Sequence, residues 1–287
     1  MTTGVTNARA IVREAAERLE AAGVPEPYVS AEILLCEVLG VGRGELAMFR
    51  GTLTVEQSAL YESWISRRIE REPVQRIIGR AYFRNIVLEL DEHTLIPRPD
   101  TESVVDTVLE SVDRREGVCR VLDLGTGSGA IAISISSERP SSEVHATDTS
   151  KKALDLARQN ATANSATVRF HHSDIAANLE NLQGSVDILV SNPPYIPSAE
   201  IKTLPPEVRD WDPTTALDGG PDGLHFYRRI LAEVSPLLAI GADVVLEIGD
   251  GQTDDVLALG EDAGFVALGT RKDLAGSTRV VILQWTG

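Results

Sequence analysis

Apolar residues recur at helical spacing through the first quarter of the chain. In residues 7–23 they stand three and four positions apart, and the same spacing returns in residues 28–40 and 54–71. A glycine or a proline follows each segment, as is usual at helix ends, and Thr54 is placed to cap the third helix. The pattern therefore predicts a small helical bundle over residues 1–73.

The spacing changes to a period of two between residues 74 and 97. β-branched and aromatic residues form short runs there, which Gly79 and Asn85 interrupt. This pattern predicts a β-hairpin that links the bundle to the rest of the chain. The arginines of residues 67–84 suit either a patch for RNA or an acidic partner, or a solvated surface; the interleaved glutamates favour the solvated surface.

Strand and helix patterns alternate from residue 98 to the end. The expected strands are 118–124, 143–147, 167–171, 185–191, 242–248, 265–270 and 279–285. The expected helices are 100–112, 129–138, 150–164, 222–238 and 252–263. Such alternation requires crossover helices, so residues 98–287 are predicted to form one α/β domain with a mostly parallel, doubly wound, seven-stranded sheet.

The charge of the chain bears on its possible partners. The 287 residues carry a formal net charge of −16. Residues 1–90 hold 11 Arg against 12 Asp and Glu, so the acidic excess lies in residues 91–287. A protein that grips duplex nucleic acid by its phosphates usually has the opposite balance, because Lys and Arg displace counterions. We therefore expect no direct nucleic-acid substrate.

Targeting signals and metal-binding patterns are not evident. The opening residues MTTGVTNARA lack the apolar core of a secretory signal, and no apolar run approaches the ~18 residues of a membrane helix. We expect a cytoplasmic protein with no membrane partner. Cys36 and Cys119 lie in a helical and a strand pattern and show no metal-ligand spacing. We expect buried thiols, with neither a disulfide nor a bound metal.

A glycine-rich segment, VLDLGTGSGAIA, joins a predicted buried strand to a predicted helix at residues 121–132. Gly125, Gly127 and Gly129 allow a sharp turn and bring the backbone amides of a helix N-terminus close to a ligand. The segment also satisfies the GxGxxG/A pattern of dinucleotide binding, so a nicotinamide-dependent reductase is an alternative at this point.

Acidic residues at predicted strand ends help to separate the two kinds of ligand. Asp123 stands ahead of the glycines, where it can meet an ammonium group but would repel a pyrophosphate, which favours a sulfonium nucleoside. Asp148 can accept from ribose hydroxyls in either ligand. Asp174 can accept from an adenine amino group while Ile175 packs on the ring, or it can cap the next helical turn.

The segment SNPPYIP leaves a predicted buried strand at Ser191 and so reaches the same crevice as the glycines. The two prolines constrain the backbone of Asn192 and Pro193. The side-chain carbonyl of Asn192 and the backbone carbonyl of Pro193 offer two acceptors, and Tyr195 offers a flat face. Together they favour a planar NH2 group as substrate, with a methyl on cationic sulfur as its electrophile. An isolated NPPY is also compatible with an ordinary tight turn.

Further motifs extend along most of the chain. They are LIPRPDTE (95–102), DLGTGSGAIA (123–132), SNPPYI (191–196), DPTTALDGGPDGL (212–224), LEIG (246–249) and KDLAGSTRVV (272–281). With these motifs and the helical N-terminal region, the chain resembles the release factor glutamine methyltransferases, the HemK or PrmC family. The resemblance implies a Rossmann-like class I methyltransferase domain and a docking role for residues 1–73.

The resemblance also implies an activity and its site. The enzyme would use S-adenosylmethionine, leaving S-adenosylhomocysteine, to methylate the glutamine amide of the GGQ motif in bacterial class I peptide chain release factors. The catalytic residues would be Asn192, Pro193 and Tyr195, which with Pro194 bind the substrate. The cofactor-binding residues would be Asp123, Gly125, Thr126, Gly127, Ser128, Gly129, Asp148, Asp174, Ile175 and Asn192. An adenine amino-methyltransferase acting on DNA or RNA is the alternative function, because the same acceptors suit its substrate.

Overall fold

The computed structural model describes residues 8–287 and divides the chain into two compact units. Unit 1 contains the chain up to Arg80 and the separate segment Pro206–Trp211. Unit 2 contains the remainder, Ala81–Pro205 and Asp212–Gly287. The chain therefore leaves unit 2 once and returns to it.

Unit 1 is helical, as the apolar spacing predicted. Its helices are α1 (Ala8–Ala21), α2 (Pro27–Leu39), α3 (Arg43–Met48), α4 (Val55–Ile69), α5 (Val74–Ile78) and α9 (Pro206–Arg209). Leu34 and Ile65 are fully buried in its core. Thr54 caps α4, because its hydroxyl accepts from the amide of Gln57 at 3.1 Å. The start of the expected first helix and of the segment judged not to be a secretory signal falls in residues 1–7, outside the described residues.

Ion pairs hold the segment Pro206–Trp211 in unit 1. Glu207 accepts from Arg68 at 3.0 Å and from Arg71 at 2.7 Å. The side chains of Arg68 and Glu207 are only 5% and 14% exposed, so water screens this pair less than a surface pair. The contact joins positions more than a hundred residues apart, and no local pattern in the sequence indicated it.

The region 74–97 differs from the hairpin that its spacing predicted. Its first part is the short helix α5, which starts after Pro73 and ends at Gly79, whose φ is +76°. The hairpin that follows consists only of β1 (Arg80–Phe83) and β2 (Ile86–Glu89). A run as short as VQRII fits a helix or a strand equally well by apolar spacing, so the period alone could not decide.

The sheet of unit 2 has seven strands in the order β5-β4-β3-β6-β7-β9-β8. Neighbours from β5 to β7 are parallel, and β9 is antiparallel to β7 and β8. The strands are β3 (Arg120–Leu124), β4 (Glu143–Asp148), β5 (Val168–His172), β6 (Val186–Ser191), β7 (Leu238–Glu247), β8 (Phe265–Lys272) and β9 (Thr278–Trp285). All seven strands agree with the sequence prediction in number and order along the chain.

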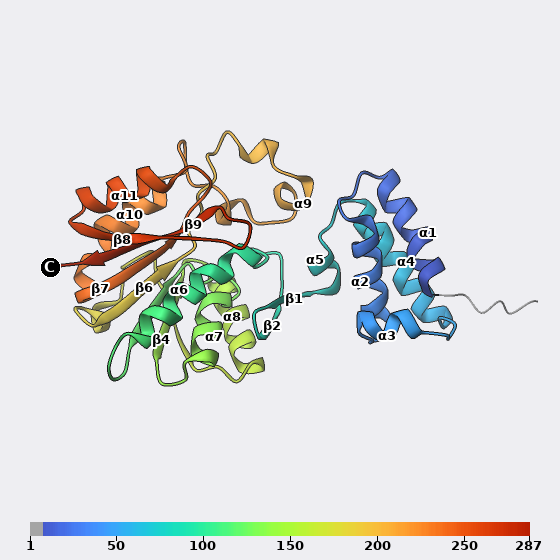
Figure 1. Cartoon of the computed structure of the whole chain (residues 1–287), viewed down its shortest axis with the longest axis horizontal. Coiled ribbons are helices and arrows are strands. Elements are labelled where there is room, and N and C mark those ends of the chain that lie inside the picture. The colour runs from blue at the N-terminus through green and yellow to red at the C-terminus, as the bar shows by residue number, and fades with distance from the viewer. Residues whose placement is uncertain (1–7) are drawn as a thin grey trace, which may run out of the picture. The chain divides into compact units, whose positions relative to one another are not determined.

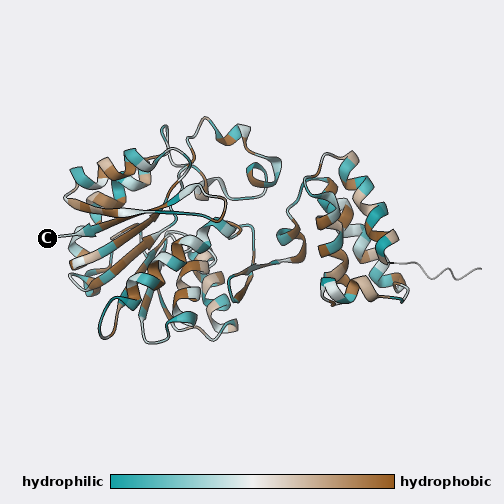
Figure 2. Cartoon of the chain, viewed as in Figure 1, coloured by the Kyte–Doolittle hydropathy of each residue, from teal (hydrophilic) through white to brown (hydrophobic). Residues whose placement is uncertain are grey.

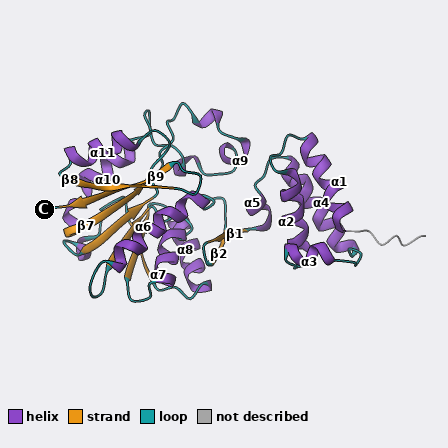
Figure 3. Cartoon of the chain, in the orientation of Figure 1, coloured by secondary structure: helices purple, strands orange, loops and turns teal. Residues whose placement is uncertain are grey.

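Helices cover both faces of this sheet (Figures 1 and 3). They are α6 (Glu102–Asp113), α7 (Ala130–Glu138) and α8 (Lys151–Ala163) on one face, and α10 (His225–Glu233) and α11 (Thr253–Asp262) on the other. Successive residues of β3 face opposite sides of the sheet. Val121 packs in the cluster with α6 and α7, and Leu122 packs in the cluster with α10 and α11. The central strands β6 and β7 are accordingly apolar along most of their length (Figure 2). The predicted doubly wound α/β architecture is confirmed.

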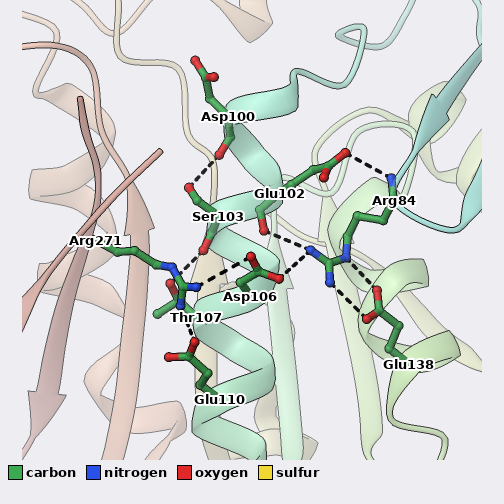
Figure 4. A network of polar contacts seen from close by, with 9 residues as sticks. All are labelled: Arg84, Asp100, Glu102, Ser103, Asp106, Thr107, Glu110, Glu138 and Arg271. Atoms are coloured by element: carbon green, nitrogen blue, oxygen red, sulfur yellow. Dashed lines mark hydrogen bonds and ion pairs between the residues drawn. The ribbon is translucent and has the colours of Figure 1, made fainter. Parts of the chain in front are cut away.

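Two polar side chains fasten the hairpin to the rest of unit 2. Asn160 of α8 is fully buried; it accepts from the amide of Glu89 at 2.8 Å and donates to the carbonyls of Glu89 at 3.1 Å and Ser128 at 2.9 Å. Arg84, in the hairpin turn, pairs with Glu138 of α7 at 2.6 Å and with Asp106 of α6 at 2.7 Å (Figure 4). The hairpin is thus bonded to α6, α7 and α8, and Asn160 of α8 also bonds the glycine segment at Ser128.

Candidate active site

A cavity of about 210 Å³ lies where β3, β4 and β6 end. Leu124, Asp148 and Ser191, the last residues of these strands, all line it. Parallel strands place their carboxyl ends at one edge of the sheet, which is where open α/β sheets bind ligands. Ten predicted site residues line the cavity: Gly125, Thr126, Gly127, Ser128, Asp148, Asp174, Ile175, Asn192, Pro193 and Pro194.

The glycine segment turns sharply between β3 and α7. Gly125 and Gly127 have φ of +73° and +55°, and a Cβ at either position would meet no protein atom within 4 Å. Their backbone is therefore open toward the cavity, and a side chain there would be strained. Gly129 is different, because a Cβ there would lie 2.6 Å from Cδ1 of Ile133. It does not line the cavity and allows close packing at the start of α7, and its expected cofactor contact stays a prediction.

Asp148 is held in a fixed orientation at the end of β4. Its Oδ2 accepts from the amide of Gly127 at 2.9 Å, and its Oδ1 accepts from the amide of Ser150 at 2.8 Å. A carboxylate has about four lone-pair sites, so two acceptor sites remain for a ligand. The side chain lines the cavity beside the glycine segment and is suited to bind two neighbouring hydroxyls.

Asp123 is buried next to the glycine segment. Its side chain is 0% exposed, does not line the cavity, and accepts from the hydroxyl of Thr126 at 2.6 Å. Burial raises the pKa of Asp123 to about 7, although the hydrogen bond from Thr126 opposes the rise. Asp123 thus supports the glycine turn from inside, and its expected contact with an ammonium group stays a prediction.

Asp174 and Ile175 line the cavity beyond β5. Asp174 forms an ion pair with Arg229 of α10 at 3.0 Å, and the bond from the amide of Ala177 goes to its backbone carbonyl. The side chain thus does not act as the helix cap considered from the sequence. Ile175 has a φ of +50°, which is unusual for a β-branched residue, and the hydroxyl of Ser173 donates to its carbonyl at 2.9 Å.

Asn192, Pro193 and Pro194 line the cavity directly after β6. The side-chain nitrogen of Asn192 donates to the hydroxyl of Thr101 at 3.2 Å. This leaves the side-chain oxygen as the acceptor that Asn192 can offer to a ligand. Sequence reasoning therefore brought the correct segment to the cavity, but it did not identify Thr101 as the partner of Asn192.

Tyr195 does not line the cavity, and its expected stacking face stays a prediction. Its side chain is partly buried in the apolar core below, and burial raises its pKa to about 12. Its backbone is enclosed by glycines: a Cβ at Gly219 would lie 2.8 Å from the Tyr195 Cα, and one at Gly223 would lie 2.4 Å from its carbonyl oxygen. That carbonyl also accepts from Gln252 at 2.9 Å. Tyr195 anchors the segment that follows the prolines.

The motif LIPRPDTE contributes cavity residues that sequence reasoning did not assign. These are Leu95, Pro97, Arg98 and Thr101, and His93 and Thr94 precede them. Arg98 pairs at 2.5 Å with Asp212, whose side chain is fully buried, and so joins this motif to the loop DPTTALDGGPDGL. The 3-10 helix η1 (Pro99–Thr101) leads into α6, where Arg84 and Ser103 bind the backbone around Asp100 and Glu102 (Figure 4).

Metal, membrane and thiol features are limited in the described part of the chain. Residues 8–287 hold no group of three or more His, Cys, Asp or Glu arranged to bind a metal ion. No helix described there is both long enough and apolar enough to cross a bilayer. Cys36 and Cys119 are free and buried, as expected.

Two family models match the chain: the PrmC N-terminal domain over residues 10–79 and the methyltransferase small domain over residues 103–204. A relative from Agrobacterium fabrum, named release factor glutamine methyltransferase, is 42% identical over 94% of this chain and 94% of its own length. The chain belongs to the release factor glutamine methyltransferase family. The resemblance found in the sequence motifs is thereby confirmed.

Solved methyltransferase structures are also similar to this chain. A release factor-specific protein-(glutamine-N5) methyltransferase from Alicyclobacillus acidocaldarius is 33% identical, covers 67% of this chain and 95% of its own, and has a TM-score of 0.43. A methyltransferase from Pyrococcus furiosus is 19% identical, covers 77% of this chain and 98% of its own, and has a TM-score of 0.52, a likeness of fold alone. The family implies S-adenosylmethionine as cofactor.

Proposed function

We propose that this chain transfers a methyl group from S-adenosylmethionine to the side-chain amide nitrogen of the glutamine in the GGQ motif of bacterial class I peptide chain release factors. The observation that carries the proposal is that Asn192 and Pro193 line the same cavity as Gly127 and Asp148. One cavity thus offers a nucleoside site and a pair of amide acceptors. A substrate of this kind places the enzyme in the cytoplasm.

The cavity residues fit the cofactor. Asp148 retains acceptor sites for the ribose hydroxyls, and the open backbone of Gly125 and Gly127 leaves room beside it. Ile175 and the Asp174 carboxylate are available to the adenine. When bound, S-adenosylmethionine supplies a methyl group on a positively charged sulfur, and its product is S-adenosylhomocysteine. No metal is required for this displacement.

The amide acceptors explain how a weak nucleophile can react. The lone pair of a carboxamide nitrogen is delocalised into its carbonyl, so the free amide attacks poorly. Asn192, through its side-chain oxygen, and Pro193, through its backbone carbonyl, would accept the two N–H groups and orient the nitrogen. The prolines at 193 and 194 keep these acceptors rigid. The amide gains the methyl group and loses one proton.

Binding of the partner involves more than the cavity. We propose that the N-terminal helical domain, residues 1–73, helps to dock the release factor, followed by a linker at 74–97 and the catalytic domain at 98–287. The match of residues 10–79 to the PrmC N-terminal domain supports a dedicated function for this region. The alternative substrate, an adenine amino group in DNA or RNA, fits the acceptors but not the net charge of −16.

The two substrates can be separated by a direct competition. The enzyme is incubated with S-adenosylmethionine labelled in the methyl group, a purified release factor, and an equal amount of adenine-containing DNA or RNA. We expect label in the protein fraction and none above background in nucleic acid. Label confined to nucleic acid would overturn the proposal in favour of the adenine amino-methyltransferase.

A further inference from the structure

Glu247 is a buried acid beside Asn192, and the methyl transfer proposed above assigns it no role. Glu247 is the last residue of β7. Ser191, the last residue of β6, pairs with Leu246 in the parallel register of the two strands, so Asn192 and Glu247 directly follow this pair. Glu247 is only 1% exposed, and its Oε2 has no hydrogen-bond partner among residues 8–287. Burying an unpaired carboxylate oxygen costs stability, so such an atom at a site calls for an explanation.

Thr101 lies beside both this acid and the amide of Asn192. The Asn192 nitrogen donates to the Thr101 hydroxyl at 3.2 Å, and Thr101 is itself 3% exposed. Burial raises the pKa of Glu247 to about 7, while hydrogen bonding from Thr101 and then from Asn192 opposes the rise. Glu247, Thr101 and Asn192 therefore form a chain of polar groups that leads from the buried end of β7 to the cavity.

The direction of this chain depends on its acid. A hydroxyl can donate to the oxygen of an asparagine amide or accept from its nitrogen, so Thr101 alone does not fix which end of Asn192 faces the cavity. At pH values above its raised pKa of about 7, Glu247 is ionised and can only accept. With an ionised Glu247 beside both groups, the Thr101 hydroxyl points its single hydrogen toward the acid and is left to accept from Asn192, whose nitrogen also faces the acid. The amide nitrogen of Asn192 then faces Thr101, and its oxygen faces the cavity.

We propose that Glu247 is a positioning residue that, together with Thr101, holds the Asn192 amide with its oxygen toward the substrate. The proposal rests on the function proposed above, in which that oxygen accepts from the glutamine amide. Glu247 does not touch the substrate in this account. It fixes the polarity of the acceptor before the substrate arrives, so that no binding energy is spent on turning the amide.

Paired substitutions test the polarity of the chain. Glu247→Gln keeps the size of the side chain but adds a donor, which can reverse the chain and turn the nitrogen of Asn192 toward the substrate. Thr101→Val removes the hydroxyl, and Thr101→Ser retains it. We expect kcat to fall by about tenfold or more in Glu247→Gln and Thr101→Val, and to stay within about threefold of wild type in Thr101→Ser.

A merely structural role would not produce this pattern. We expect calorimetry to show affinity for S-adenosylhomocysteine within about threefold of wild type in all three variants, so the loss falls on kcat. Asp243→Asn is the matched control, because Asp243 is also a buried acid of β7 but bonds Ser111 and Arg115. It is expected to lower Tm while leaving kcat within about threefold of wild type.

The outcomes distinguish this inference from the proposed function. If wild-type enzyme methylates a release factor and Asn192→Ala does not, but Glu247→Gln turns over at the wild-type rate, this inference alone is wrong. Equal loss of kcat in Thr101→Ser and Thr101→Val also overturns it, and this pair decides the matter if Glu247→Gln does not fold. If wild-type enzyme fails to methylate any release factor, the proposed function itself fails.

Discussion

Single residues divide the cavity into a cofactor side and a substrate side. Asp148 is fixed by the amides of Gly127 and Ser150, whereas Asn192 is fixed by Thr101. Neither residue depends on the other for its orientation, because these hydrogen bonds involve different partners. Substitutions on the two sides should therefore affect different kinetic constants.

Asn192→Ala removes the side-chain acceptor without altering the cofactor side. We expect turnover to become undetectable, while affinity for S-adenosylhomocysteine stays within a few fold of wild type. Asp148→Ala is the complementary variant and should mainly weaken cofactor binding, measured by calorimetry. A large loss of cofactor affinity in Asn192→Ala, with little loss of turnover at saturation, would contradict this division.

Asp123 should make stability depend on pH. Burial raises its pKa from 3.8 to about 7, so its contribution is fully present below about pH 4 and is lost as pH rises toward 7. Asp123→Asn removes this dependence. The free energy of unfolding of the variant, relative to that of the wild type, should therefore increase by roughly 1.4 kcal/mol for each unit of rising pH between these limits. Urea unfolding of cofactor-free protein at pH 4, 5.5 and 7 checks this. Parallel curves for the two proteins would contradict a buried, protonatable Asp123.

At the scale of elements, the loops after β6 and β7 hold the substrate segment in place. The glycines of DPTTALDGGPDGL allow the backbone of Tyr195 to approach closely, and Gln252, just before α11, binds its carbonyl at 2.9 Å. A Cβ at Gly249, after β7, would lie 3.0 Å from the Tyr195 ring. These glycines allow the segment 212–224 and the loop after β7 to approach the segment that follows the two prolines.

Gly219→Ala tests this arrangement. The new Cβ would lie 2.8 Å from the Cα of Tyr195, closer than real contacts allow, so the backbone after Pro194 must move. We expect kcat for release factor methylation to fall by about tenfold or more, with a smaller change in cofactor affinity. Gly44→Ala, which places its Cβ in open space, is the control and should behave as wild type. Unchanged kcat in Gly219→Ala would show that the segment tolerates displacement.

The elements were largely predictable because alternating buried strands and amphipathic helices leave strong periodic signals. The short helix α5 was missed because five residues do not define a period, although Pro73 before it and Gly79 after it are helix-boundary residues. The contacts of Thr101 and Glu207 were not predictable in the same way. They join residues distant along the chain, and their local sequences, PDT and PPEV, carry no apolar pattern.

At the scale of the whole molecule, the chain is acidic and its proposed substrate is another protein. Nearly all of the net charge of −16 belongs to residues 91–287, which include every cavity-lining residue. A field of one sign around a site attracts partners of the opposite sign and is screened by salt. We therefore infer that the charge steers a basic region of the release factor toward the cavity.

Salt should slow the encounter between enzyme and release factor. We expect the association rate constant, measured by stopped flow, to fall about tenfold between roughly 50 and 500 mM NaCl, with a smaller change in the dissociation rate constant. Binding of adenosine, a small uncharged control, should change little over the same range. An association rate independent of salt would contradict electrostatic steering.

We expect this cavity to methylate one glutamine amide. The most direct measurement is peptide mass spectrometry of a class I release factor after incubation with the enzyme and S-adenosylmethionine. We expect a gain of about 14 Da, one methyl in place of one hydrogen, on the glutamine of the GGQ peptide and no gain with Asn192→Ala. A GGQ peptide of unchanged mass, or the same gain with Asn192→Ala, would contradict it.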